Sequence, residues 1–171
     1  MVDAPAAPLK TPSDIGRNEA STVADALNAI LADTFALYIK TKNFHWHVSG
    51  PHFRDYHLML DDQSDQIFAT TDPLAERVRK LGKRTIHSIG EVHSKTRVKD
   101  QNADHLEPLA MLQELMLDNK TMAAAMRETH KICDDHEDVA TASLLEVYID
   151  ETERRTWFLF EAMQGAGDTG H

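Results

Sequence analysis

The stretch FHWHVSGPHFRDYHLMLDDQSDQIFATTDPLAERVRKLG, residues 44–82, decides how the chain folds. It contains the end of one helical pattern, the short turn SGP at 49–51, and a second helical pattern. From Phe53 to Leu81 the positions of one face recur in steps of four and three, and the same spacing runs from Val23 to Val48. Because the connection is short, we expect two long helices that pack antiparallel.

The remainder of the chain repeats this arrangement after a long connection. Residues 83–105 are polar and weakly periodic, with one short helix expected near His87–Ser94. Two further helical stripes follow, from Pro108 to Cys133 and from Val139 to Met163. Two hairpins joined by one long crossover are typical of ferritin-like bundles. We therefore predict an all-α, ferritin-like four-helix bundle over residues 19–164, with flexible tails at 1–18 and 165–171.

The second helix has one position where it could be interrupted. Pro73 removes a backbone hydrogen bond, so a kink is expected near it. Alternatively, Asp72 could act as an N-cap with proline at the first helical position, which would break the helix there.

Composition narrows the class of protein. The chain of 171 residues carries a formal charge of −10, which disfavours general nucleic-acid coating and suits cationic partners. Cys133 is the single cysteine, so no internal disulfide can form. We find neither a signal peptide nor a membrane span in the sequence and expect a cytoplasmic protein.

Histidines and acids are spaced for metal binding in and after the 49–51 turn. His57 and Asp61 are four residues apart, as are Asp72 and Glu76, so each pair shares a helix face. The distance from Asp61 to Asp72 is roughly 16 Å along a helix, too far for one ion. The chain contains no Glu-x-x-His motif, which excludes the di-iron design of bundles that hold both ions within one chain.

A two-fold axis would bring the two pairs together. Both His57 with Glu76 and Asp61 with Asp72 are centred between residues 66 and 67, so antiparallel packing of two copies would juxtapose them. His45, at the end of the first helix, would be a further ligand. Histidine and carboxylate suit iron, manganese or zinc. His57 could instead be a hydrogen-bonded core residue. Trp46 is more often a core residue than a reactive one, although an oxidisable ring near a redox metal could intercept one-electron oxidants.

Other charged groups have simpler interpretations. Six histidines are interpreted as lacking a paired acid at helical spacing, so we expect solvated or core roles for them: His87, His93, His105, His130, His136 and His171. The acidic turn at 134–138 is either a solvated loop or a lining for a cation path in an oligomer; its acids are Asp134, Asp135, Glu137 and Asp138. The basic run at 77–84 is expected to complement a helix C-terminus and form salt bridges.

The segments FHWHVSGPHF, YHLMLDD and DPLAERVRKLG resemble the DNA-protection-during-starvation (Dps) miniferritins, and the resemblance extends over roughly residues 20–163. It implies a hollow shell of twelve subunits with metal sites at two-fold interfaces. It also implies oxidation of Fe(II), preferentially by hydrogen peroxide, and deposition of Fe(III) mineral in the cavity. The implied ligands are His45, His57, Asp61, Asp72 and Glu76, with Trp46 beside the site.

The tails depart from family members that condense DNA with lysine-rich ends. The N-terminal tail has Lys10 and Arg17 against Asp3 and Asp14, and the C-terminal tail has no lysine or arginine. Twelve chains would carry a charge of about −120, which argues against DNA binding. Two alternatives stay open at this point: a DNA-binding nucleoid-protecting protein, and an oligomer that sequesters zinc or another metal without redox chemistry.

Overall fold

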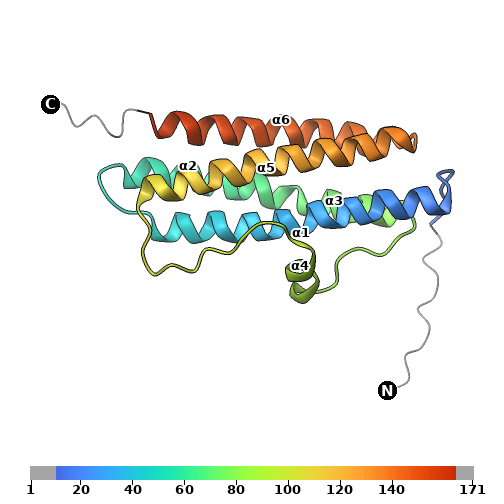
Figure 1. Ribbon diagram of the computed structural model, residues 1–171, viewed down its shortest axis with the longest axis horizontal. Coiled ribbons are helices and arrows are strands. Elements are labelled where there is room, and N and C mark those ends of the chain that lie inside the picture. Colours follow the sequence, from blue (N-terminus) through green and yellow to red (C-terminus); the bar gives the residue numbers. More distant parts are fainter. Residues whose placement is uncertain (1–10, 165–171) are drawn as a thin grey trace, which may run out of the picture.

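The computed structural model describes residues 11–164 and is helical, with no strand in that range. Three long helices and one interrupted helix run alongside one another, and a short helix lies outside them on the crossover (Figure 1). The elements are α1 (Arg17–His47), α2 (Phe53–Ala69), α3 (Thr71–Lys80), α4 (Ile89–Lys95), α5 (Pro108–Asp135) and α6 (Val139–Ala162). The predicted all-α bundle with a long crossover is confirmed. The predicted tail at 165–171 and the first ten residues lie outside the described range.

The predicted stripes form the core. Leu27, Phe44, Leu60, Leu112 and Leu145 are at most 1% exposed and come from four different helices. Burying each such side chain contributes roughly 1.5–3 kcal/mol relative to leaving it in water. Two predicted stripe positions in first turns of helices are instead exposed, Phe53 at 44% and Leu109 at 37%.

The second helix is interrupted at Thr70, two residues before the predicted N-cap. Asp72 does not cap a helix; it lies in the first turn of α3. Pro73 has no N–H to donate, so the helical ladder cannot continue unbroken there. The hydroxyls of Thr70 and Thr71 donate to the carbonyls of Ile67 and Phe68, at 2.8 and 2.7 Å. The interruption therefore arises from the missing donor together with two side chains that bond back to the preceding turn.

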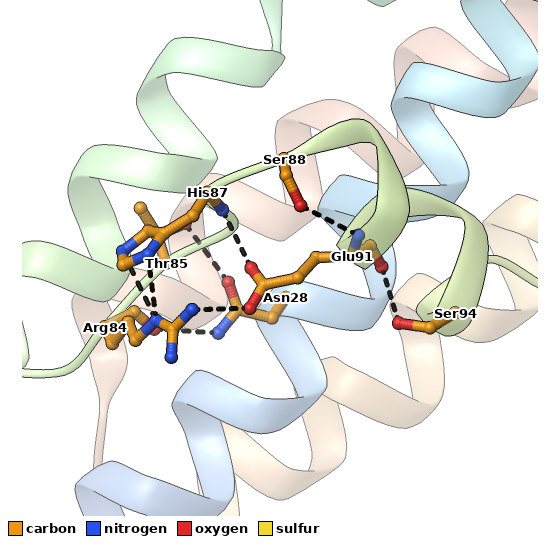
Figure 2. A network of polar contacts seen from close by, with 7 residues as sticks. All are labelled: Asn28, Arg84, Thr85, His87, Ser88, Glu91 and Ser94. Atoms are coloured by element: carbon orange, nitrogen blue, oxygen red, sulfur yellow. Dashed lines mark hydrogen bonds and ion pairs between the residues drawn. The ribbon is translucent and has the colours of Figure 1, made fainter. Parts of the chain in front are cut away.

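The first half of the crossover is fastened to α1 by side chains (Figure 2). Asn28 of α1 donates to the Arg84 carbonyl at 3.0 Å and accepts from the Thr85 hydroxyl at 3.1 Å. Ser88 caps α4 by accepting from the Glu91 N–H, while the Glu91 carboxylate accepts from the His87 N–H at 2.8 Å. These bonds define the start of a helix of only seven residues.

The second half of the crossover is anchored by one buried acid. Asp33 of α1 is 3% exposed and accepts from the Arg97 guanidinium at 2.5 and 2.8 Å. It also accepts from the Arg97 backbone N–H and the Thr96 hydroxyl. These polar contacts to α1 add to the packing of Ile86, Val98 and Leu106 against the core in holding the connection between α3 and α5.

By length and composition alone, α1 could cross a membrane, contrary to the expectation that the chain has no membrane span. More than half of its most apolar window is buried inside the bundle. A core helix satisfies the same criteria of length and composition, and the burial of α1 agrees with that role.

Candidate metal site

The turn between α1 and α2 brings His45 and His57 face to face. Their rings stack with centroids 3.8 Å apart and planes inclined by 22°. His45 Nδ1 lies 2.8 Å from the carbonyl of His57, and His57 Nδ1 lies 2.9 Å from the carbonyl of His45. Because a carbonyl oxygen can only accept, each Nδ1 carries the proton in these bonds. In the neutral rings both Nε2 atoms then keep a lone pair, the form in which imidazole binds a metal.

Asp61 lies one turn further along α2 and adds a carboxylate to this pair. Its Oδ1 is 3.7 Å from His45 Nε2 and 2.5 Å from Lys42 Nζ. The hydrogen bond from Lys42 lowers the pKa of Asp61 against a smaller opposing effect of burial. The same bond raises the pKa of Lys42. The carboxylate is thus ionised at neutral pH, with a lysine occupying the position where a cation would bind.

Asp72 and Glu76 lie on α3 and do not join these three residues. Both are exposed, and the carboxylate of Glu76 meets only Lys80, at 3.5 Å, among the described ion pairs. Within residues 11–164, no three histidine, cysteine, aspartate or glutamate side chains of one chain come together as a metal site. The candidate ligands of one chain therefore form two separate groups. His45, His57 and Asp61 lie at the α1–α2 end, and Asp72 and Glu76 lie on α3.

Trp46 follows His45 but occupies a different surface. Its side chain is 63% exposed and lines a cavity of about 540 Å³ between the end of α1 and crossover residues 98–106. The predicted role of Trp46 beside a metal stays a prediction.

Two features outside this site differ from expectation. Asp138 in the acidic turn is 2% exposed, because it caps α6 through the Thr141 N–H and accepts from Arg77 at 2.5 Å. It therefore does not line a solvated turn. His130 and His105 were expected to lack an acid partner. His130 instead lies 3.1 Å from both Asp134, four residues on, and Glu146 of α6, and His105 lies 3.0 Å from Glu107. The spacing to Asp134 was the signal that sequence reasoning overlooked, and Lys42 was missed because it shares no motif with Asp61.

Known proteins share both the sequence and the fold. Residues 24–165 match the family model of the ferritin-like domain. The DNA protection during starvation protein of Agrobacterium fabrum is 31% identical over 150 residues, which cover 88% of this chain and 93% of that protein. Its counterpart in Halobacterium salinarum is 32% identical over 136 residues, covering 80% and 75%. The chain belongs to the Dps branch of the ferritin-like family.

Solved Dps structures have the same architecture. The archaeal Dps homologue from Halobacterium salinarum superposes with a TM-score of 0.87 at 28% identity, covering 96% of this chain and 93% of that one. Dps from Mycobacterium smegmatis gives 0.85 at 28% identity, with 92% and 96% covered. Membership of the Dps branch associates the chain with iron storage and protection.

Proposed function

We propose that this protein is a ferroxidase that oxidises Fe(II) with hydrogen peroxide and stores the Fe(III) product as mineral. The observation that carries the proposal is the His45–His57 pair, in which two backbone carbonyls hold both Nδ1 protons and leave both Nε2 atoms free. Imidazole nitrogen combined with carboxylate oxygen is a donor set that suits iron. Asp61 supplies the adjacent carboxylate.

A second copy of the chain completes the site in this proposal. Asp72 and Glu76 are exposed, so they are available to a partner. Antiparallel packing of the α2–α3 arm about a two-fold axis between residues 66 and 67 would set Glu76 against the partner's His57, and Asp72 against the partner's Asp61. An isologous contact of this kind creates two identical sites per pair. We extend it to a homo-oligomeric shell of twelve chains enclosing the mineral, and we place the protein in the cytoplasm.

The chemistry requires two electrons and two protons. Each of two Fe(II) ions loses one electron, the O–O bond of one hydrogen peroxide molecule breaks, and its two oxygens take up two protons and leave as two water molecules. Two ions held together deliver both electrons to one peroxide, so no hydroxyl radical is released. His45, His57 and the carboxylates bind the ferrous substrate, and Lys42 must leave Asp61 when iron arrives.

The test loads metal-free protein with two Fe(II) per chain without oxygen and then adds one hydrogen peroxide per two irons. We expect rapid growth of near-ultraviolet absorbance with little hydroxyl radical. Glu76→Gln should slow oxidation by at least about tenfold, since even outer-sphere partners of a metal are worth 10–100-fold. Because Glu76 is exposed in the single chain, the variant should still fold, and gel filtration checks that it still assembles. Glu128→Gln on α5 is the matched control, an exposed acid outside the site.

Two results would contradict the proposal. An unchanged rate of Fe(II) oxidation in an assembled Glu76→Gln protein would show that Glu76 of α3 does not contribute to the site. Tight zinc retention with slow ferrous oxidation and abundant radical would instead favour a metal-sequestering oligomer, because histidine and carboxylate do not select iron by themselves.

A further inference from the structure

One side of the bundle is open in the middle. α1 approaches α2 and α5 closely and α5 approaches α6, whereas α2 and α6 approach each other far less. A cavity of about 360 Å³ lies between α2 and α6. One water needs about 10–15 Å³ of such volume, so there is room for a small ligand and several waters.

Two buried polar side chains line this cavity without full partners. Gln63 of α2 is 3% exposed, and neither its amide nitrogen nor its amide oxygen has a hydrogen-bond partner. Arg155 of α6 is 4% exposed. Its Nε donates to Asn119 at 2.9 Å and its Nη2 to Thr152 at 2.7 Å, but Nη1 donates to nothing. Buried polar groups are nearly always satisfied, so these three atoms call for hydrogen-bond partners that a ligand or water would supply.

The charge of Arg155 indicates which kind of ligand. Burial lowers the pKa of Arg155 to about 10, so the guanidinium is still a cation at neutral pH. Glu151, one turn earlier on α6, raises the pKa of Arg155 against the larger effect of burial, but among the described ion pairs no carboxylate contacts the guanidinium. A buried charge is costly unless it is paired. Asp62 and Arg154, both exposed at the cavity rim, have opposite charges and add no net charge there.

We propose that the cavity between α2 and α6 binds a small monovalent anion. Arg155 Nη1 and Gln63 Nε2 donate to the anion, and the Gln63 carbonyl oxygen accepts from a hydroxyl of the ligand or from an accompanying water. The cation also repels Fe(II), so the centre of the bundle, where other helical proteins hold metals, is closed to iron. The site shares none of its proposed anion-binding residues with the five candidate metal ligands.

The experiment is equilibrium dialysis of the assembled protein against radiolabelled chloride, with gluconate holding the ionic strength constant. A parallel experiment uses labelled bicarbonate, which carries its own hydroxyl. Adding unlabelled bicarbonate to labelled chloride, and the reverse, identifies the anion that the cavity prefers. We expect saturable binding of one anion per chain. Gln63→Met, which changes no charge, should weaken it at least several-fold, and Arg155→Met should abolish it. Arg127→Met, which removes an exposed arginine of α5, should bind as the unmodified protein does.

Thermal unfolding supplies a second readout for the same variants. The melting temperature should rise with the logarithm of the chloride or bicarbonate concentration, and this rise should disappear in Gln63→Met. Absence of saturable binding in both arms would overturn the proposal and leave the cavity to water. Equal binding by Gln63→Met and Arg127→Met would place any bound anion elsewhere and would also overturn it.

Discussion

The imidazoles of His45 and His57 owe their chemistry to the backbone around them. Each ring is oriented by the other residue's carbonyl, at 2.8 and 2.9 Å, so the turn between α1 and α2 determines which nitrogen carries the proton. Orientation of this kind is what outer-sphere carbonyls provide to metal-binding histidines. The sequence showed that the two histidines were near a turn, but reciprocal bonding requires the two helix ends to face each other at this register.

Lys42 is expected to oppose metal binding. Replacing it in Lys42→Met removes the ammonium that hydrogen-bonds Asp61 and leaves the carboxylate free for a cation. The pKa of Asp61 should rise toward its ordinary value, since Lys42 is the main cause of its lowering. Calorimetric titration with Zn(II), which is not oxidised, should show tighter binding than in the unmodified protein. Lys120→Met, at an exposed position of α5, is the control. Weaker binding in Lys42→Met would mean that the lysine positions Asp61 for the metal.

Cys133 should be inert in the folded protein. Burial raises the pKa of its thiol to about 12 from an ordinary value near 9.0, so the thiol is not ionised at pH 8. Mass spectrometry should find no alkylation by iodoacetamide until the protein is unfolded. The folded state keeps its proton where the unfolded state loses it, so the free energy of unfolding should fall as pH rises from about 9 to 12. Rapid alkylation of the native protein at pH 8 would contradict the burial.

At the scale of elements, the long helices and the crossover were predictable, and the position of the break within the second helix was not. Heptad spacing predicted α1, α5 and α6 to within a few residues, because a repeated apolar face reports burial directly. The possible break was predicted at Asp72, two residues after the observed interruption at Thr70. Proline in the sequence indicates a missing backbone donor. Local packing decides whether the hydroxyls of Thr70 and Thr71 donate to carbonyls of the preceding turn. The Ser88-x-x-Glu91 spacing could have indicated the start of α4.

The crossover should loosen if its anchor is removed. Asp33→Ala deletes the acceptor of three bonds from Arg97 and one from Thr96, and we expect a loss of about 2–3 kcal/mol in the free energy of unfolding. Hydrogen exchange should quicken in residues 89–98 before it does in α5. Asp25→Ala, at an exposed position of α1, should change stability by less than about 0.5 kcal/mol. Equal effects of the two variants would show that the buried ion pair does not fasten the crossover.

At the scale of the whole molecule, charge governs the choice of macromolecular partner. The chain has 28 acidic against 18 basic residues. The basic run predicted to form salt bridges is engaged within the chain: Arg77 contacts Asp138, Lys80 contacts Glu76, Arg84 contacts Glu91, Arg79 donates to the Lys83 carbonyl, and Lys83 donates to Ser21. Three of these five cations thus meet a carboxylate within the chain, whereas Arg79 and Lys83 bond only to neutral oxygens.

The assembled protein should not bind DNA tightly. Affinity for DNA comes largely from cations that neutralise phosphates, and the net charge of −10 per chain opposes this. We expect no gel shift of linear double-stranded DNA at physiological salt, and at most a weak shift at low salt. Tight binding at low salt would contradict this prediction and show that locally placed cations outweigh the net negative charge.

The sequence by itself determined the helical bundle, the crossover, the family and the five candidate ligands, because periodicity and ligand spacing are local properties of a chain. Only the tertiary structure decided that the Nδ1 atoms of His45 and His57 each donate to the other residue's carbonyl. The same holds for the ion pair between Lys42 and Asp61 and for the buried cap that Asp138 forms at the start of α6. The tertiary structure also decided that Gln63 and Arg155 share a cavity. These contacts join residues from different helices or from opposite sides of a turn. Their existence depends on how the helices pack, which no single stretch of sequence specifies.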